Sequence, residues 1–70
     1  MEWNVVQGGW IAYQPAVKQR WSRIPDRVIE TIAGDRERLV ACVQALSHIP
    51  REGADRQVAD WQARLAKRAP

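Results

Sequence analysis

The chain has 70 residues, a formal net charge of +3 and a sequence pI of about 9.8. We expect this length to form one domain over residues 1–70, with no room for a second. Cys42 is the only cysteine and His48 the only histidine, which excludes an internal disulfide and a zinc site built from these residue types. No apolar run approaches the roughly 20 residues that span a bilayer, and no secretory signal is recognisable. We therefore expect a cytoplasmic protein without metal, cofactor or membrane segment.

The first third of the chain carries an apolar stripe with steps of three or four residues, the period of one helical face. The stripe consists of Trp3, Val6, Trp10, Tyr13, Val17, Trp21 and Ile24. Since a proline inside a helix removes a hydrogen bond and clashes with the preceding turn, Pro15 predicts a break or sharp kink near Gln14. We thus expect one helix over residues 2–13 and a shorter one from Pro15 to about Ser22. A close approach of another element would explain Gly8 and Gly9 within the first.

The middle of the chain predicts two short helices. Pro25 suits a first helical position, and Asp26 lies in the first turn, where the helix dipole favours an acid. The apolar positions that follow are Val28, Ile29, Ile32 and Ala33, and then Leu39, Val40, Val43 and Leu46. Gly34 separates the two sets, so either one long helix tolerates it or a helix ends there. We prefer an end at Gly34 and a new start near Asp35, because glycine is the usual residue just past a helix end.

The last predicted helix starts at Ile49-Pro50, after the short connection Ser47-His48. Its apolar stripe consists of Ala54, Val58, Trp61 and Leu65. Trp61 is the candidate to close the core from this end of the chain.

Several landmarks along the chain together resemble one known family. They are Met1-x-Trp3, Val6-x-Gly8-x-Trp10, Val17-Lys18 with Trp21, Ile32-Ala33-Gly34-x-Arg36-x-x-Leu39-Val40, Val43-Gln44, Glu52-x-Ala54 and Val58-x-Asp60-Trp61. Each landmark is common by itself, but their joint spacing from Met1 to about Trp61 is similar to the CsbD-like family of small bacterial general-stress proteins.

This resemblance implies an all-α fold, a small bundle of four to five short helices packed as two roughly orthogonal helical hairpins. It also implies cytoplasmic expression under general stress, with no enzyme activity and no cofactor. The family offers no catalytic or binding residues to carry over.

The chain departs from the family pattern at several positions. Pro25 and Pro50 stand where family members commonly have a helix-capping serine or threonine, and Pro15 stands where glycine is common. Ser47-His48 replaces a Tyr-Gly pair. Many members are also richer in lysine and aspartate, so surface-dependent partners do not transfer to this chain.

Neither Cys42 nor His48 predicts a catalytic site. Cys42 lies beside Ala41 and Val43 on a helix face, where a cysteine behaves as a small hydrophobe. No carboxylate pattern orients His48 toward it. The tryptophans are a possible stacking platform for bases or sugars, but their helical spacing favours a core role for Trp10 and Trp21. Trp3 is close to a chain end, where helices fray.

Basic residues form two runs that are candidates for contact with phosphate or another partner. The first is Lys18, Arg20, Arg23 and Arg27, and the second is Arg64, Lys67 and Arg68. If the fold brings them together they predict a phosphate-binding patch, although interspersed acids favour an ordinary solvated surface.

We therefore expect a non-enzymatic, stress-associated protein that acts by binding or by its abundance, as a monomer or with weak self-association. The alternative is a weak nucleic-acid binder without sequence preference, using the basic runs.

Overall fold

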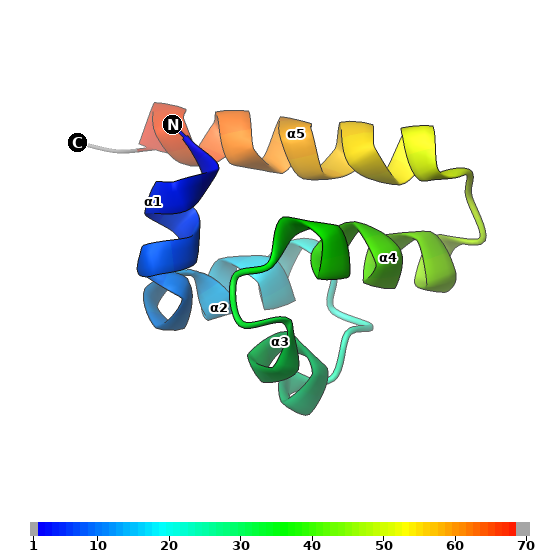
Figure 1. Ribbon diagram of the computed structural model, residues 1–70, viewed down its shortest axis with the longest axis horizontal. Helices are drawn as coiled ribbons and strands as arrows, with labels where there is room; N and C mark the ends of the chain where they lie inside the picture. The colour runs from blue at the N-terminus through cyan, green and yellow to red at the C-terminus, as the bar shows by residue number, and fades with distance from the viewer. Residues whose placement is uncertain (1, 69–70) are drawn as a thin grey trace.

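Residues 2–68 fold into five α-helices joined by short turns, and no strand occurs among them (Figure 1). The computed structural model describes this part of the chain, with side chains described as far as Leu65. The helices are α1 (Trp3–Gly8), α2 (Trp10–Arg20), α3 (Asp26–Ile32), α4 (Arg36–Ser47) and α5 (Arg51–Arg68). The predicted small all-α bundle is confirmed.

Helices α4 and α5 form an antiparallel hairpin that makes up one side of the molecule (Figure 1). Helix α1 crosses the open end of this hairpin, beginning beside the C-terminal part of α5. Helix α2 packs against α3, and α3 in turn contacts α4. The N-terminal three helices thus close the core that the hairpin leaves open.

The core is continuous and contains side chains from all five helices and from the turn after α2. Its buried members are Val6, Trp10, Val17, Trp21, Ile24, Ile29, Ile32, Leu39, Val40, Val43, Ala54, Val58 and Trp61. The predicted stripes supply every one of them. Trp61 closes the core as predicted, because its ring lies 6.1 Å from that of Trp3 and 5.6 Å from that of Trp21. Such tilted pairs of large aromatics are a favourable packing geometry.

The helix boundary predicted near Gln14 is wrong, because the chain breaks at Gly9 and α2 continues through Pro15. The Gly9 N–H bonds to the Val5 carbonyl at 3.1 Å and ends α1. Pro15 cannot bond to the carbonyl of Ile11, four residues earlier. Both residues are exposed, so water can hydrate that carbonyl and the helix tolerates the proline.

A glycine is required at the turn between α3 and α4, although not for the reason expected. The predicted helix end is confirmed, but the residue just past it is Ala33, with a φ of 53°, and Gly34 follows with a φ of 81°. A Cβ on Gly34 would lie only 2.9 Å from the Cα of Gln7 in α1. A close approach was expected at Gly8 and Gly9, but a Cβ on Gly8 would meet nothing within 4 Å, and a Cβ on Gly9 would meet the Tyr13 side chain at 3.3 Å.

Helix starts follow the sequence closely. Asp35 caps α4, and its carboxylate accepts hydrogen bonds from the backbone N–H groups of Glu37 and Arg38. Pro25 and Pro50 lie immediately before α3 and α5, not at the first helical position that was predicted. Their carbonyls accept the first helical hydrogen bonds of α3 and α5.

Candidate functional site

The first basic run separates in the structure instead of forming one patch. The Lys18 ammonium is held at the turn after α2, where it donates to the Ile24 carbonyl at 2.9 Å and lies 3.7 Å from an Asp26 carboxylate oxygen. This lysine stabilises the turn between α2 and α3. Arg27 lies exposed in the first turn of α3 and lines none of the hollows described below. Two arginines of the run are left to act together.

Arg20 and Arg23 line the same shallow hollow, at the C-terminal ends of α2 and α4. The hollow has a volume of about 270 Å³, and Leu46 and Ser47 form its other side. The Arg20 guanidinium lies 5.2 Å from the centroid of the Trp21 ring, within cation–π range. Neither arginine makes an ion pair with an acid among the described residues. Two cationic side chains at one hollow suit contact with an anionic group such as a phosphate.

None of the described side chains of the second basic run lines this hollow. Arg64 is exposed on α5 and does not line it. The side chains of Lys67 and Arg68 lie outside the described residues, although both belong to α5.

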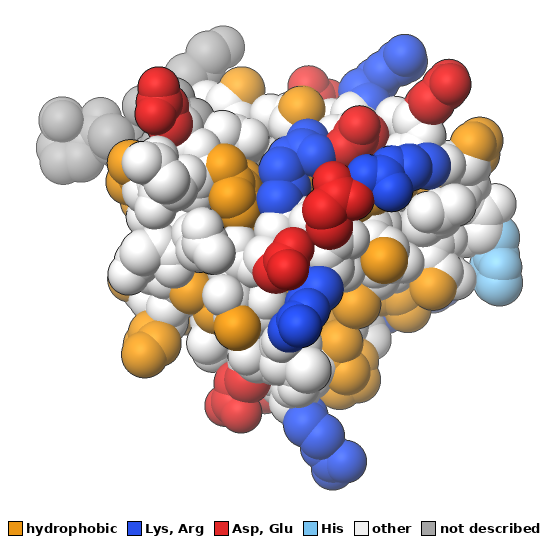
Figure 2. All heavy atoms as spheres, viewed as in Figure 1, with side chains coloured by type: hydrophobic (Ala, Val, Ile, Leu, Met, Phe, Trp, Pro, Cys, Tyr) orange, Lys and Arg blue, Asp and Glu red, His pale blue; other side chains and the backbone are white. Residues whose placement is uncertain are grey.

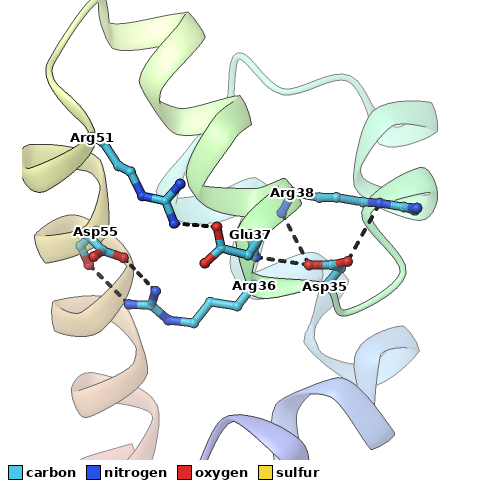
Figure 3. Close-up of polar contacts among 6 residues, drawn as sticks. All are labelled: Asp35, Arg36, Glu37, Arg38, Arg51 and Asp55. Atoms are coloured by element: carbon cyan, nitrogen blue, oxygen red, sulfur yellow. Dashed lines mark hydrogen bonds and ion pairs between the residues drawn. The ribbon is translucent and has the colours of Figure 1, made fainter.

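Charged side chains between α4 and α5 are paired across the hairpin (Figure 3). Arg36 of α4 reaches Asp55 of α5, with 2.5 Å between guanidinium Nη1 and carboxylate Oδ1. Arg51 at the start of α5 donates to the carboxylate of Glu37, whose hydrogen bond and charge raise the pKa of the Arg51 guanidinium. These four charges hold two helices together and are thereby neutralised as a surface feature.

Positive and negative side chains alternate over this face of the molecule and do not separate into areas of one sign (Figure 2). Arg38 adds to the pattern, because its guanidinium lies 3.7 Å from the carboxylate of Asp35 and donates to the Thr31 carbonyl. The hairpin therefore has an ordinary solvated surface, as the mixed charges in the sequence predicted.

Cys42 and His48 lie in structural positions. Cys42 is half-buried on α4 against the core, and this burial raises the pKa of its thiol, which lowers the fraction of reactive thiolate. His48 is exposed and ends α4 with a φ of 52°. No group of three or more His, Cys, Asp or Glu side chains able to hold a metal ion occurs among the described residues.

Three of the tryptophans donate their indole N–H to partners within the fold. Trp3 donates to the Gly34 carbonyl at 2.7 Å, and Trp10 donates to the Ile29 carbonyl at 2.9 Å. Trp21 donates to the Gln57 side chain at 3.2 Å. Trp3, which was expected to be the least certain of the stripe, is therefore held against the α3–α4 turn, and these rings belong to the fold and not to a stacking platform.

An apolar groove that was not predicted runs between α2 and α3. It consists of two adjoining hollows of about 630 and 340 Å³ that share Ile11, Gln14 and Glu30 as lining residues. Ile11 is 85% exposed on its wall. The sequence signal was present but easily overlooked, since Ile11 is a large apolar residue that lies off the predicted stripe.

No helix within residues 2–68 has the combination of length and apolar character that crossing a bilayer demands.

The chain is similar to several bacterial proteins over most of its length. It is 40% identical over 58 residues to the UPF0337 protein NE2439 of Nitrosomonas europaea, a match that covers 83% of this chain and 62% of that protein. It is 30% identical over 57 residues to the UPF0337 protein YjbJ of Escherichia coli K12, covering 81% of this chain and 83% of the relative. The UPF0337 protein ECA0631 of Pectobacterium atrosepticum is 26% identical over 62 residues, with coverage of 89% and 90%. No family model matches the chain. No solved structure gives a significant match to it.

Proposed function

The chain belongs to the UPF0337 family, the CsbD-like family, and we propose that it is a non-enzymatic cytoplasmic protein that acts under general stress by binding a partner. The stress association rests on the resemblance to small bacterial general-stress proteins set out above. The mode of action rests on how the chain uses its reactive side chains.

One observation supports the non-enzymatic assignment: several of the side chains that could do chemistry are already used by the fold. Asp35 caps α4, while Glu37 and Asp55 each bind an arginine across the hairpin. The raised pKa of the Cys42 thiol disfavours its use as a nucleophile. An active site needs groups with pKa values and positions matched to a reaction, and these are matched to helix ends and helix pairs instead.

The experiment that tests this proposal measures expression and survival in the bacterium that encodes the chain. Transcript and protein levels are measured in unstressed growth and under osmotic, oxidative and starvation stress, and survival of a deletion strain is scored in each. We expect induction under stress and impaired survival without the protein. Equal levels in all conditions together with full survival of the deletion strain would contradict the stress assignment.

Complementation of the deletion strain with variants of the chain distinguishes binding from catalysis. The variants Cys42→Ala and His48→Asn remove the two side chains with the greatest catalytic potential, and each suits its backbone position, because asparagine tolerates a positive φ. Both variants should restore survival as well as the parent. An enzyme is indicated if either variant melts like the parent yet fails to restore survival.

A second candidate function is weak nucleic-acid binding at Arg20 and Arg23. It is favoured by their shared hollow and by their lack of an acid partner among the described residues. With two phosphate contacts the logarithmic salt slope on duplex DNA would be about −2, and binding would be indifferent to sequence. Fluorescence titration of unrelated duplexes at low and physiological salt tests this. We expect weak binding at low salt that Arg20→Gln with Arg23→Gln abolishes, and the candidate is discarded if the double variant binds like the parent.

A further inference from the structure

The groove between α2 and α3 combines an apolar lining with an acidic charge. The larger hollow is lined by Trp10, Ile11, Ala12 and Ala33, together with the polar residues Gln7, Gln14 and Glu30. Ile11 and Val5 are the large apolar side chains found exposed in the described part of the chain, and Ile11 borders both hollows. A single exposed apolar residue is ordinary, but one that walls an apolar groove is a feature of binding surfaces.

Gly8 leaves one part of the larger hollow without a side chain. It lines the larger hollow at the end of α1, and a Cβ there would meet nothing within 4 Å. Its φ is not positive, so neither a turn nor a close contact requires glycine. Gly8 is the last residue of α1, so the penalty of glycine relative to alanine is at most roughly 1 kcal/mol, the value for a helix interior. The absence of a side chain at Gly8 leaves this part of the hollow open.

The charge of the groove is opposite to that of the whole protein. Glu30 lies in both hollows and has no ion-pair partner among the described residues. Asp26 and Lys18 line the far end and lie 3.7 Å apart, so their charges offset one another. What remains is one acidic group beside an apolar floor, on a chain with a net charge of +3.

We propose that this groove binds a basic amphipathic helix of a partner protein, with apolar side chains over Ile11 and Trp10 and a lysine or arginine beside Glu30. An amphipathic helix supplies apolar anchors every three to four residues, with charges on the flanks of that stripe. A second copy of this chain fits less well, because a two-fold contact centred on Ile11 would bring the two Glu30 carboxylates toward each other. The proposal deepens the proposed function, on which it rests, by naming the kind of partner.

A defined set of peptides tests the proposal on the full chain. The probe is an 18-residue helical peptide with leucines on one face and lysines flanking them. One control permutes the same residues so that no leucine face forms, and another replaces the lysines by glutamates. Binding is followed by ¹⁵N–¹H correlation spectra of the protein, which detect even millimolar affinities. We expect the probe to bind at least about tenfold more tightly than the permuted peptide, as burial of one isoleucine-sized contact implies, with shifts at Gly8, Gly9, Ile11 and Ala33.

Two variants assign the binding to the groove. Ile11→Ser removes an exposed side chain that the fold does not use, and should weaken binding of the probe about tenfold without lowering the melting temperature. Glu30→Lys should weaken binding of the lysine probe about fivefold and favour the glutamate peptide. Asp60→Asn, an exposed acid of α5, is the matched control and should leave binding unchanged.

The proposal is overturned if the probe causes no shifts at millimolar concentration, if the permuted peptide binds equally, or if Ile11→Ser binds like the parent. Sedimentation of the protein alone provides another decisive outcome: a dimer that Ile11→Ser dissociates would assign the groove to a second copy. Failure of the proposal is distinguishable from failure of the proposed function. The survival assay with Cys42→Ala tests whether the protein is an enzyme, whereas the peptide titration tests only the groove, so either result can fail without the other.

Discussion

The hairpin of α4 and α5 and the three N-terminal helices are stabilised by different kinds of contact. Across the hairpin, ion pairs join the helices from outside, from Arg36 to Asp55 and from Arg51 to Glu37 (Figure 3). In the N-terminal half, buried or half-buried indoles donate to backbone carbonyls of distant segments, as Trp3 does to Gly34 and Trp10 to Ile29. The two halves therefore use different polar contacts: side-chain ion pairs between helices in the hairpin, and indole-to-carbonyl hydrogen bonds in the N-terminal half.

The N-terminal half differs because part of its surface is not explained by the fold. Ile11 is exposed, Gly8 has no structural need to be glycine, and Glu30 makes no ion pair among the described residues. Each of these choices is neutral or unfavourable for stability. The comparison indicates that the charges paired across the hairpin serve the fold, while the N-terminal half carries the groove that we propose as a binding surface. The predictions below test this division, beginning with the largest effect.

Replacing Trp10 by alanine should cost about 3–5 kcal/mol, the usual range for deleting a buried large aromatic. The ring is only 6% exposed, and its loss also leaves the Ile29 carbonyl without its donor. Since domains are generally stable by roughly 5–15 kcal/mol, the variant should be largely unfolded. Urea denaturation followed by tryptophan fluorescence measures the effect.

The neighbouring variant Ile11→Ala is the matched control for Trp10→Ala. Ile11 is exposed, so the free energy of unfolding should change by no more than about 0.5 kcal/mol. If both variants were equally destabilised, Ile11 would belong to the core and the division proposed above would fail.

Gly34→Ala should destabilise the protein by about 1–3 kcal/mol, because alanine at a φ of 81° is strained. Its Cβ would also press on the Cα of Gln7 and separate α1 from the α3–α4 turn. Gly8→Ala, by contrast, should stabilise the protein by up to about 1 kcal/mol. Thermal melts of the two variants give the comparison, and a neutral Gly34→Ala would mean that α1 is not docked at this turn.

Asp35→Ala should cost about 1 kcal/mol, the typical loss of a helix N-cap. The carboxylate accepts from the backbone N–H of Glu37 at 3.0 Å and from that of Arg38 at 3.4 Å. Asp35→Asn is the control, since asparagine caps nearly as well and should restore most of the loss. Equal melting temperatures for parent and alanine variant would show that the cap contributes nothing.

Hydrophobic periodicity predicted most of this fold and little of its surface. Every buried core residue lies on a predicted stripe, since a period of three to four residues directly encodes which face of a helix is buried. The break at Gly9 was missed because Pro15 is the stronger local signal for a helix end. Helix α2 tolerates this proline because Ile11 and Pro15 are both exposed to solvent. That orientation is a tertiary property which no local pattern reveals.

The candidate sites were harder to predict because they depend on which helices meet. Lys18 belonged to the basic run in sequence, but the turn after α2 brings Ile24 and Asp26 to its ammonium. Of the predicted contact residues whose side chains the structure describes, Arg20 and Arg23 lie at one hollow. The groove at Ile11 requires α3 to lie beside α2, which the sequence does not specify.

The ion pair between Arg36 and Asp55 should contribute about 0.2–1 kcal/mol, the usual value for partly exposed pairs. The two side chains are 29% and 45% exposed, so solvent weakens the attraction despite the 2.5 Å contact. A double-mutant cycle with Arg36→Gln and Asp55→Asn isolates the coupling, which should fall as salt is raised. Coupling that salt does not change would indicate a pair shielded from solvent.

Cys42 should give the smallest effect, a loss of stability at high pH. Burial raises the pKa of its thiol in the folded protein above the ordinary value of 9.0, so the folded state holds the proton more tightly than the unfolded chain. The resulting stabilisation is fully present below pH 9.0 and is lost as the pH rises through the folded pKa. Urea denaturation of the parent and of Cys42→Ala at neutral pH and above pH 10 measures it. Other titrating groups are common to both proteins and cancel in the difference, so the parent should lose more stability than the variant. An identical loss would place the thiol in full contact with solvent and remove one argument against its use as a nucleophile.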